Sequence, residues 1–143
     1  MERPFVDPNS VVDSGDGVVE VRLPSRPESS RLARAYVQQQ WPDLSEVVLS
    51  DVELIATELV TNAVRHGAPV IRLRLRREPF AVDVAVLDGS TRLPPTRVAP
   101  VSVDSHGGRG LAIVDALAER WGVDVLPADA GKSVWATVCT AAT

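Results

Sequence analysis

Glu58 and Asn62 are four residues apart in a stretch whose apolar residues recur at helical spacing. In a helix they stack one turn apart on the same face, at the edge of the apolar stripe. A carboxylate there can orient or deprotonate a nucleophile, and an amide oxygen one turn further on can bind a hard Mg²⁺ ion. On spacing alone, a solvated helix flank is the commoner explanation of such a pair.

Two other features carry possible chemistry. Asp88 ends an apolar run before Gly89, where it can accept a hydrogen bond from a purine amino group or simply form an Asp-Gly turn. The glycines Gly107, Gly108 and Gly110 directly precede an expected helix, whose free N–H groups can bind phosphate. They do not have a Rossmann spacing, because a Pro-rich loop and not a strand precedes them. The segment 131–133, Gly-Lys-Ser, does not complete a P-loop either, because position 126 is Leu.

The elements that must position these residues follow from hydrophobic periodicity. Alternating or continuous apolar runs predict strands, and spacings of three and four predict helices. Gly67 and Pro69 end the long helix. The expected strands cover 18–23, 71–76, 80–87, 122–126 and 133–140, and the expected helices cover 27–41, 45–67 and 110–121. Between them, residues 89–107 contain three prolines and no periodicity, which is typical of a lid or binding loop. The order predicts an α/β two-layer sandwich, a mixed sheet covered by helices on one face.

Length and composition narrow the class of protein. The 143 residues fit one domain over 17–143, preceded by a flexible tail over 1–16. A net charge of −4 argues against a broad nucleic-acid footprint, and no apolar run reaches the roughly 20 residues that span a bilayer. The N-terminus has no apolar core of a signal peptide. Cys139 is expected to be a buried, inert thiol, and the sequence predicts a cytoplasmic protein.

The order of the motifs resembles a known family. The segment 58–67, Glu-Leu-Val-Thr-Asn-Ala-Val-Arg-His-Gly, resembles the N box of the Bergerat (GHKL) ATPases, and 86–90, Val-Leu-Asp-Gly-Ser, resembles their adenine-binding box. The segment 108–111, Gly-Arg-Gly-Leu, resembles the glycine box after the ATP lid, and 131–135 resembles the final strand. Within that superfamily, the chain is similar to the anti-sigma-factor serine kinases, especially the small ATP-binding regulators of actinomycetes.

The resemblance implies ATP and Mg²⁺ as cofactors and assigns roles to single residues. Glu58 would be the general base that activates a protein serine, and Asn62 would bind Mg²⁺ and the phosphates. Asp88 would hold the adenine amino group. His66, in contrast, is read as a residue of the helix C-terminus and not as a catalyst.

The glycine box implies a phosphate site. Gly108 and Gly110 would cradle the phosphates, and Arg109 would add a cation near them or be a surface group. The match has two departures. Ser90 and Arg92 replace glycines of the adenine box, and the Gly-Thr pair of the last strand is here Gly-Lys, with Ser133 expected to supply the missing hydroxyl.

Three functions remain open. The first is a protein serine kinase that phosphorylates an anti-anti-sigma (STAS-type) partner and sequesters a sigma factor. The second is a nucleotide-gated binding module without kinase activity. The third, the catalytic domain of a histidine kinase, is disfavoured because no helix with a phosphoacceptor is expected before the domain. The resemblance also implies a homodimer, for which Tyr36 and Trp41 could supply aromatic anchors; the alternative, that both pack inward, fits Trp41 better.

Overall fold

The computed structural model describes residues 11–13, 15–92 and 106–140, with only the backbone for 11, 12 and 106–110. In this part of the chain, six strands and three α-helices follow one another. The strands are β1 (Val11–Asp13), β2 (Val18–Leu23), β3 (Ile71–Arg77), β4 (Ala81–Asp88), β5 (Arg120–Val125) and β6 (Lys132–Cys139). The helices are α1 (Ser29–Gln40), α2 (Glu46–His66) and α3 (His106–Leu117).

The strands form one sheet in the order β1-β2-β3-β4-β6-β5. Every described pair of neighbouring strands is antiparallel, so the expectation of a mixed sheet was wrong in this detail. The connections explain why. Two helices lie between β2 and β3, and one helix and one strand lie between β4 and β6. In each case the chain runs the length of the sheet twice before it enters the second strand, which therefore runs opposite to the first.

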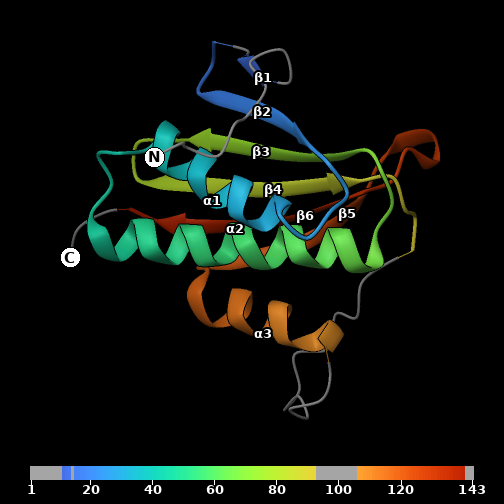
Figure 1. The fold of residues 1–143 in the computed structure, drawn as a ribbon. Coiled ribbons are helices and arrows are strands. Elements are labelled where there is room, and N and C mark those ends of the chain that lie inside the picture. The colour runs from blue at the N-terminus through green and yellow to red at the C-terminus, as the bar shows by residue number, and fades with distance from the viewer. Residues whose placement is uncertain (1–10, 14, 93–105, 141–143) are drawn as a thin grey trace.

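The helices cover one face of this sheet, as expected for a two-layer α/β sandwich (Figure 1). Alternation along β3 shows which face is inside, because Ile71, Leu73 and Leu75 are buried whereas the arginines between them are exposed. Helix α2 lies centrally against β3, β4 and β6, with α1 and α3 on either side of it. The opposite face of the sheet has no helix over it in the described residues and is largely polar.

Helix α2 forms where the sequence predicts it, because both ends carry specific signals. The Ser45 hydroxyl accepts a hydrogen bond from the Val48 N–H at 3.3 Å, which caps the N-terminus. At the other end, the Gly67 N–H donates to the Ala63 carbonyl. The buried residues recur at steps of three and one and face the sheet: Val52, Ile55, Ala56, Leu59, Val60 and Ala63.

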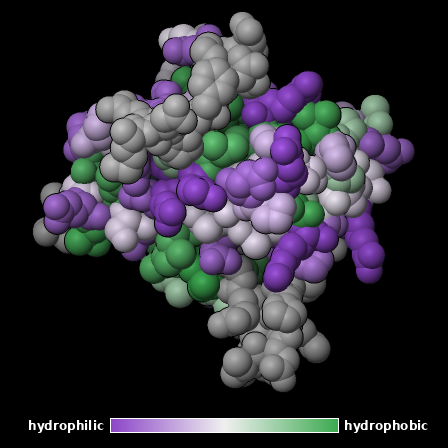
Figure 2. Space-filling model, in the orientation of Figure 1, coloured by the Kyte–Doolittle hydropathy of each residue, from purple (hydrophilic) through white to green (hydrophobic). Residues whose placement is uncertain are grey.

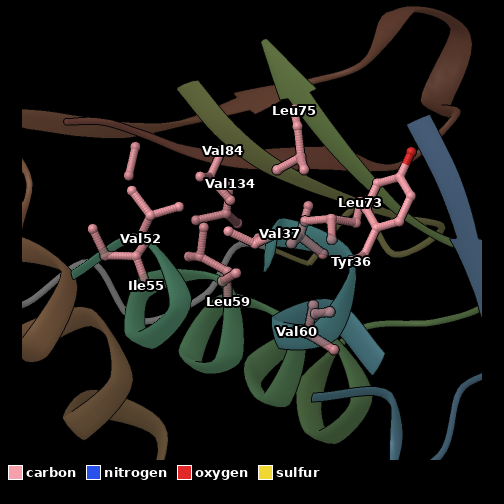
Figure 3. Packing of buried hydrophobic residues seen from close by; sticks show 14 of the residues in the cluster. Tyr36, Val37, Val52, Ile55, Leu59, Val60, Leu73, Leu75, Val84 and Val134 are labelled. Carbon is pink, nitrogen blue, oxygen red and sulfur yellow. The ribbon is translucent and has the colours of Figure 1, made fainter. Parts of the chain in front are cut away.

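The core lies between this stripe and the inner face of the sheet (Figure 3). Tyr36 and Trp41 both belong to it, with 1% and 5% of their surface exposed. The hypothesis that Tyr36 is a surface anchor for dimerisation was therefore wrong. Helix α1 turns Ser29, Ala33, Tyr36 and Val37 inward at helical spacing, so Tyr36 is on its buried stripe.

Helix α3 begins earlier and ends earlier than predicted. Gly107, Gly108 and Gly110 lie inside its first turns, although glycine is a poor helix former. Packing overrides this propensity, since Leu111 and Val114 are fully buried. Trp121, expected on the helix, is in β5 opposite Ala136, and its indole N–H donates to Asp115 at 2.8 Å.

Three further expectations concern the ends and the surface. Residues 11–13 of the predicted tail form β1, which pairs with β2, whereas most of the predicted lid, 93–105, lies outside the described residues. Cys139 is exposed and not buried, because strand alternation turns Val138 inward and Cys139 outward. Within the described residues, no helix has the length and apolarity needed to cross a membrane.

Apolar side chains on the surface are scattered. Among the large exposed ones, Val47 and Leu54 lie on α2, Val125 ends β5, and Val70 and Phe80 lie outside the helices and strands. In the view of Figure 2, hydrophilic side chains are spread between smaller hydrophobic groups over the visible face. Single exposed apolar residues of this kind are normal on a soluble surface, so they identify no dimer interface.

Candidate functional site

A cavity of about 490 Å³ opens between the C-terminal half of α2 and the ends of β4 and β6. This volume is within the range of about 300–1,000 Å³ that is usual for small-molecule sites. Helix α2 contributes five residues, and the others come from β4, β6 and the turn after β4. The described lining consists of Leu59, Asn62, Ala63, Arg65, His66, Val86, Asp88, Arg92, Lys132 and Val134.

The cavity brings together two of the predicted site residues, Asn62 and Asp88. They are 26 positions apart in the chain and meet because β4 lies under α2. Leu59, Val86 and Val134 give the space apolar walls, while Asn62 and Asp88 supply polar groups. Such a mixture, apolar walls with a few placed polar groups, is typical of sites for small organic ligands.

Asp88 is the most constrained polar residue of the site. It is 3% exposed, and Lys132 beside it is also 3% exposed. The Lys132 ammonium Nζ lies 3.0 Å from Oδ1 and 2.9 Å from Oδ2 of the carboxylate. The two residues face each other because β4 and β6 pair in a register that sets Asp88 opposite Lys132. They form a buried ion pair in the wall of the cavity.

Two backbone N–H groups also hold the Asp88 carboxylate. Oδ1 accepts hydrogen bonds from the Ser90 N–H at 2.8 Å and the Ala68 N–H at 3.3 Å. The bond to Ser90 is an Asx turn, so Asp88 both forms the Asp-Gly turn and lines the cavity. In return, the Gly89 N–H donates to the Ala68 carbonyl at 2.7 Å. These bonds join the end of α2 to the end of β4.

Two glycines make room for this arrangement. A Cβ at Gly67 would lie 2.6 Å from Asp88 Cγ, so a side chain there would displace the carboxylate. A Cβ at Gly131 would lie 1.9 Å from the Asp88 carbonyl oxygen, and Gly131 has a φ of +114° that other residues rarely adopt. Gly67 and Gly131 therefore allow their backbone to approach Asp88 closely.

Ser90 and Arg92, which replace the usual glycines of the adenine box, have defined positions. The Arg92 N–H donates to the Ser90 hydroxyl at 3.1 Å, which extends the turn after Asp88. Arg92 then lines the cavity together with Arg65 and His66 from the last turn of α2. The two arginines add positive charge to a cavity whose one described carboxylate is already paired with Lys132. Neither Arg65 nor Arg92 was predicted as a site residue from the sequence.

Glu58 is half-buried on α2, one turn before Asn62 as its spacing predicts. Among the described lining residues, Asn62 is present and Glu58 is not. The same part of the chain has no group of three or more His, Cys, Asp or Glu placed to hold a metal ion.

The expectation for Ser133 does not fit the structure. Successive strand residues point to opposite faces, so Lys132 and Val134 face the cavity and Ser133 faces the uncovered side of the sheet. There Ser133 lines a separate hollow of about 430 Å³ with Trp135 and Thr137. Lys132, which was not predicted as a site residue, is the residue of this strand that contacts Asp88.

The predicted phosphate-binding residues lie at the start of α3. Gly108, Arg109 and Gly110 are helical in the first turns, and helix α3 packs against α2. Their side chains lie outside the described residues, so the role predicted for Arg109 stays a prediction.

Comparison with known proteins agrees with this geometry. Residues 23–138 match the family model of the histidine kinase-like ATPase domain. The chain belongs to this family. The match spans both α2 and the strands that carry Asp88 and Lys132, and it implies that the domain binds ATP.

One curated relative also matches part of the chain. The chain is similar to an uncharacterised protein of Streptomyces coelicolor, with 40% identity over 72 residues. This alignment covers 48% of the chain and 68% of the relative. The histidine kinase-like ATPase domain described here therefore has a relative in an actinomycete, and the name of that relative carries no activity.

Proposed function

We propose that this histidine kinase-like ATPase domain is a cytoplasmic regulator of the anti-sigma-factor type. It binds Mg²⁺-ATP, transfers the γ-phosphate to a serine of an anti-anti-sigma (STAS-type) protein, and sequesters a sigma factor. The observation that carries the proposal is the cavity that Asn62 and Asp88 line together, within a domain of an ATP-binding family. Direct contact with nucleic acid is no part of this role.

The residues of the cavity suit a nucleotide and a metal ion. Asp88, deep at the end of β4, offers a carboxylate for a base amino group, and the Asn62 amide oxygen suits Mg²⁺. Mg²⁺ would neutralise phosphate charge, and Arg65 and Arg92 add cations to the same cavity. The backbone of Gly108 and Gly110 at the start of α3 would contact phosphate oxygens.

Glu58 is the proposed general base. Its position one helical turn before Asn62 would allow its carboxylate to accept the proton of a partner's serine hydroxyl near the phosphate end of the cavity. Phosphoryl transfer depends mainly on positioning and charge neutralisation, which Asn62, the arginines and the start of α3 would supply.

A nucleotide-gated binding module without kinase activity is the second candidate. One observation favours it: Glu58 is not among the described residues that line the cavity. In that case, the bound nucleotide would change the affinity for a protein partner, and Asn62 and Asp88 would keep their roles.

A transfer assay separates the two candidates. Purified protein, γ-labelled ATP and candidate partners encoded by neighbouring genes should give a phosphorylated serine. Glu58→Gln should bind ATP as the wild type does and lose the transfer, whereas Glu53→Gln, a control five residues earlier on α2, should retain it. Transfer at the normal rate by Glu58→Gln would eliminate Glu58 as the base. ATP binding without transfer to any partner would favour the binding module.

A further inference from the structure

The Asp88–Lys132 pair has unused hydrogen-bonding capacity. An ammonium group has three N–H donors, and a carboxylate has about four acceptor positions. Lys132 Nζ engages both oxygens of Asp88, and no other described group accepts a hydrogen bond from it. At least one N–H donor of Lys132 is therefore left, on a side chain that is 4% exposed and lines the cavity.

The two carboxylate oxygens of Asp88 have different numbers of hydrogen-bond partners. Oδ1 of Asp88 accepts from Lys132, Ser90 and Ala68. Oδ2 lies 2.9 Å from Lys132 Nζ, and that is its one partner among the described residues. Oδ2 thus keeps acceptor capacity directly beside the unused donor of Lys132. A ligand that presents an acceptor next to a donor can use this remaining hydrogen-bonding capacity of the pair.

We propose that Asp88 and Lys132 act as one base-reading unit, in which Lys132 donates directly to a ring nitrogen while Asp88 accepts from the neighbouring amino group. An edge with a donor next to an acceptor is complementary to this pair, and the adenine N6 amino group beside N1 is such an edge. The inference rests on the proposed ATP site and adds Lys132 to it as a specificity-determining residue.

The unit also predicts which base is rejected. When the phosphates fix the orientation of the nucleotide, guanine presents its O6 acceptor where adenine presents the N6 donor. Two acceptors, O6 and Asp88 Oδ2, would then face each other, and the N1–H donor of guanine would face the Lys132 ammonium. Sites built to hydrogen-bond a particular group discriminate strongly in this way.

Titration calorimetry with three nucleotides tests the proposal. ATP is compared with 1-deaza-ATP, in which a C–H replaces the N1 acceptor, and with GTP. The wild type should bind 1-deaza-ATP roughly 10- to 100-fold more weakly than ATP, the range expected for one hydrogen bond to a charged donor. It should bind GTP at least about 100-fold more weakly than ATP. These comparisons need no variant, so they do not depend on whether a substitution folds.

Two substitutions show whether Lys132 causes the preference. Lys132→Met should weaken ATP binding and remove the difference between ATP and 1-deaza-ATP. Arg65→Met, the matched control, removes a cation from the same cavity and should leave that difference unchanged. If Lys132→Met does not fold, the double substitution Asp88→Asn/Lys132→Met, which removes both charges, takes its place.

The possible outcomes test the role of Lys132, the orientation of the base and ATP binding separately. Equal affinity of the wild type for ATP and 1-deaza-ATP, or a preference that persists in Lys132→Met, would overturn the role of Lys132 and leave ATP binding intact. Tighter binding of GTP than of ATP would overturn the orientation of the base. Failure of every nucleotide to bind a folded sample would overturn the proposed function and this inference with it.

Discussion

Removing the Lys132 ammonium should destabilise the fold even without any nucleotide. The side chains of Lys132 and Asp88 are 4% and 1% exposed, and their charged groups are 2.9 Å apart at the closest. Lys132→Met keeps most of the side-chain volume and leaves the Asp88 carboxylate in place without its counter-ion. The site should then hold an uncompensated buried charge.

The size of the loss follows from what remains around Asp88. Breaking a buried ion pair by removing one partner costs about 3–5 kcal/mol. Asp88 keeps the N–H groups of Ala68 and Ser90, so we expect the lower end, about 3 kcal/mol. In Asp88→Asn/Lys132→Met both charges are absent, and stability should return to within about 1 kcal/mol of the wild type because replacing a whole buried pair is often neutral.

Urea unfolding followed by circular dichroism measures both variants. With an m-value of about 2 kcal/mol/M, a loss of 3 kcal/mol lowers the midpoint by about 1.5 M. The single and double variants should differ mainly in midpoint and not in slope. A Lys132→Met protein as stable as the wild type would refute the reasoning. A double variant less stable than the single one would refute it as well. Either result means that Asp88 and Lys132 do not neutralise each other's charge in a buried ion pair.

Three further predictions concern other positions. Burial, with a smaller contribution from the charge of Asp13, raises the pKa of Tyr36 from 10.0 to about 12. The neutral phenol of Tyr36 therefore contributes fully to the free energy of unfolding below pH 10, and this contribution is lost as the pH rises through 12. Relative to Tyr36→Phe, the wild type should lose about 1.4 kcal/mol of unfolding free energy by pH 11 in urea unfolding, and a difference between the two proteins that does not change with pH would contradict this. Gly131→Ala, which brings a Cβ to 1.9 Å from the Asp88 carbonyl, should lower the melting temperature much more than Gly15→Ala, where φ is +78° but the space is open; equal losses would mean that the close approach is unimportant. Ser133→Ala should leave the ATP dissociation constant within about twofold of the wild type, a change of less than about 0.5 kcal/mol, and a larger effect in calorimetry would return Ser133 to the nucleotide site.

Much of this arrangement could be predicted from local patterns. Helix α2 was predictable because its cap at Ser45, its apolar stripe and its stop at Gly67 all lie within one segment. Asp88 was predictable because it follows an apolar strand and precedes a glycine. Asn62 followed from its place at the edge of the stripe, and the structure sets it in the same cavity as Asp88.

The errors arose where distant segments meet. Lys132 was overlooked because its contact with Asp88 depends on the register between β4 and β6, which no local pattern encodes. The same register, combined with strand alternation, turns Ser133 to the other face. The start of helix α3 was predicted too late because its glycines were placed before the helix, whereas they lie in its first turns ahead of the buried Leu111. Tyr36 was considered as a surface anchor because an aromatic residue on an amphipathic helix suits an interface and a core equally well.

The central claim is that Asn62 and Asp88 line a site for Mg²⁺-ATP, and titration calorimetry with and without Mg²⁺ tests it most directly. The wild type should bind ATP in the presence of Mg²⁺, and Asn62→Ala should weaken this binding at least about tenfold, or about 1.4 kcal/mol, while binding without Mg²⁺ changes much less. Gln39→Ala, an exposed position on α1, is the control and should bind as the wild type does. A folded wild-type sample that gives no heat with ATP or ADP would contradict the claim.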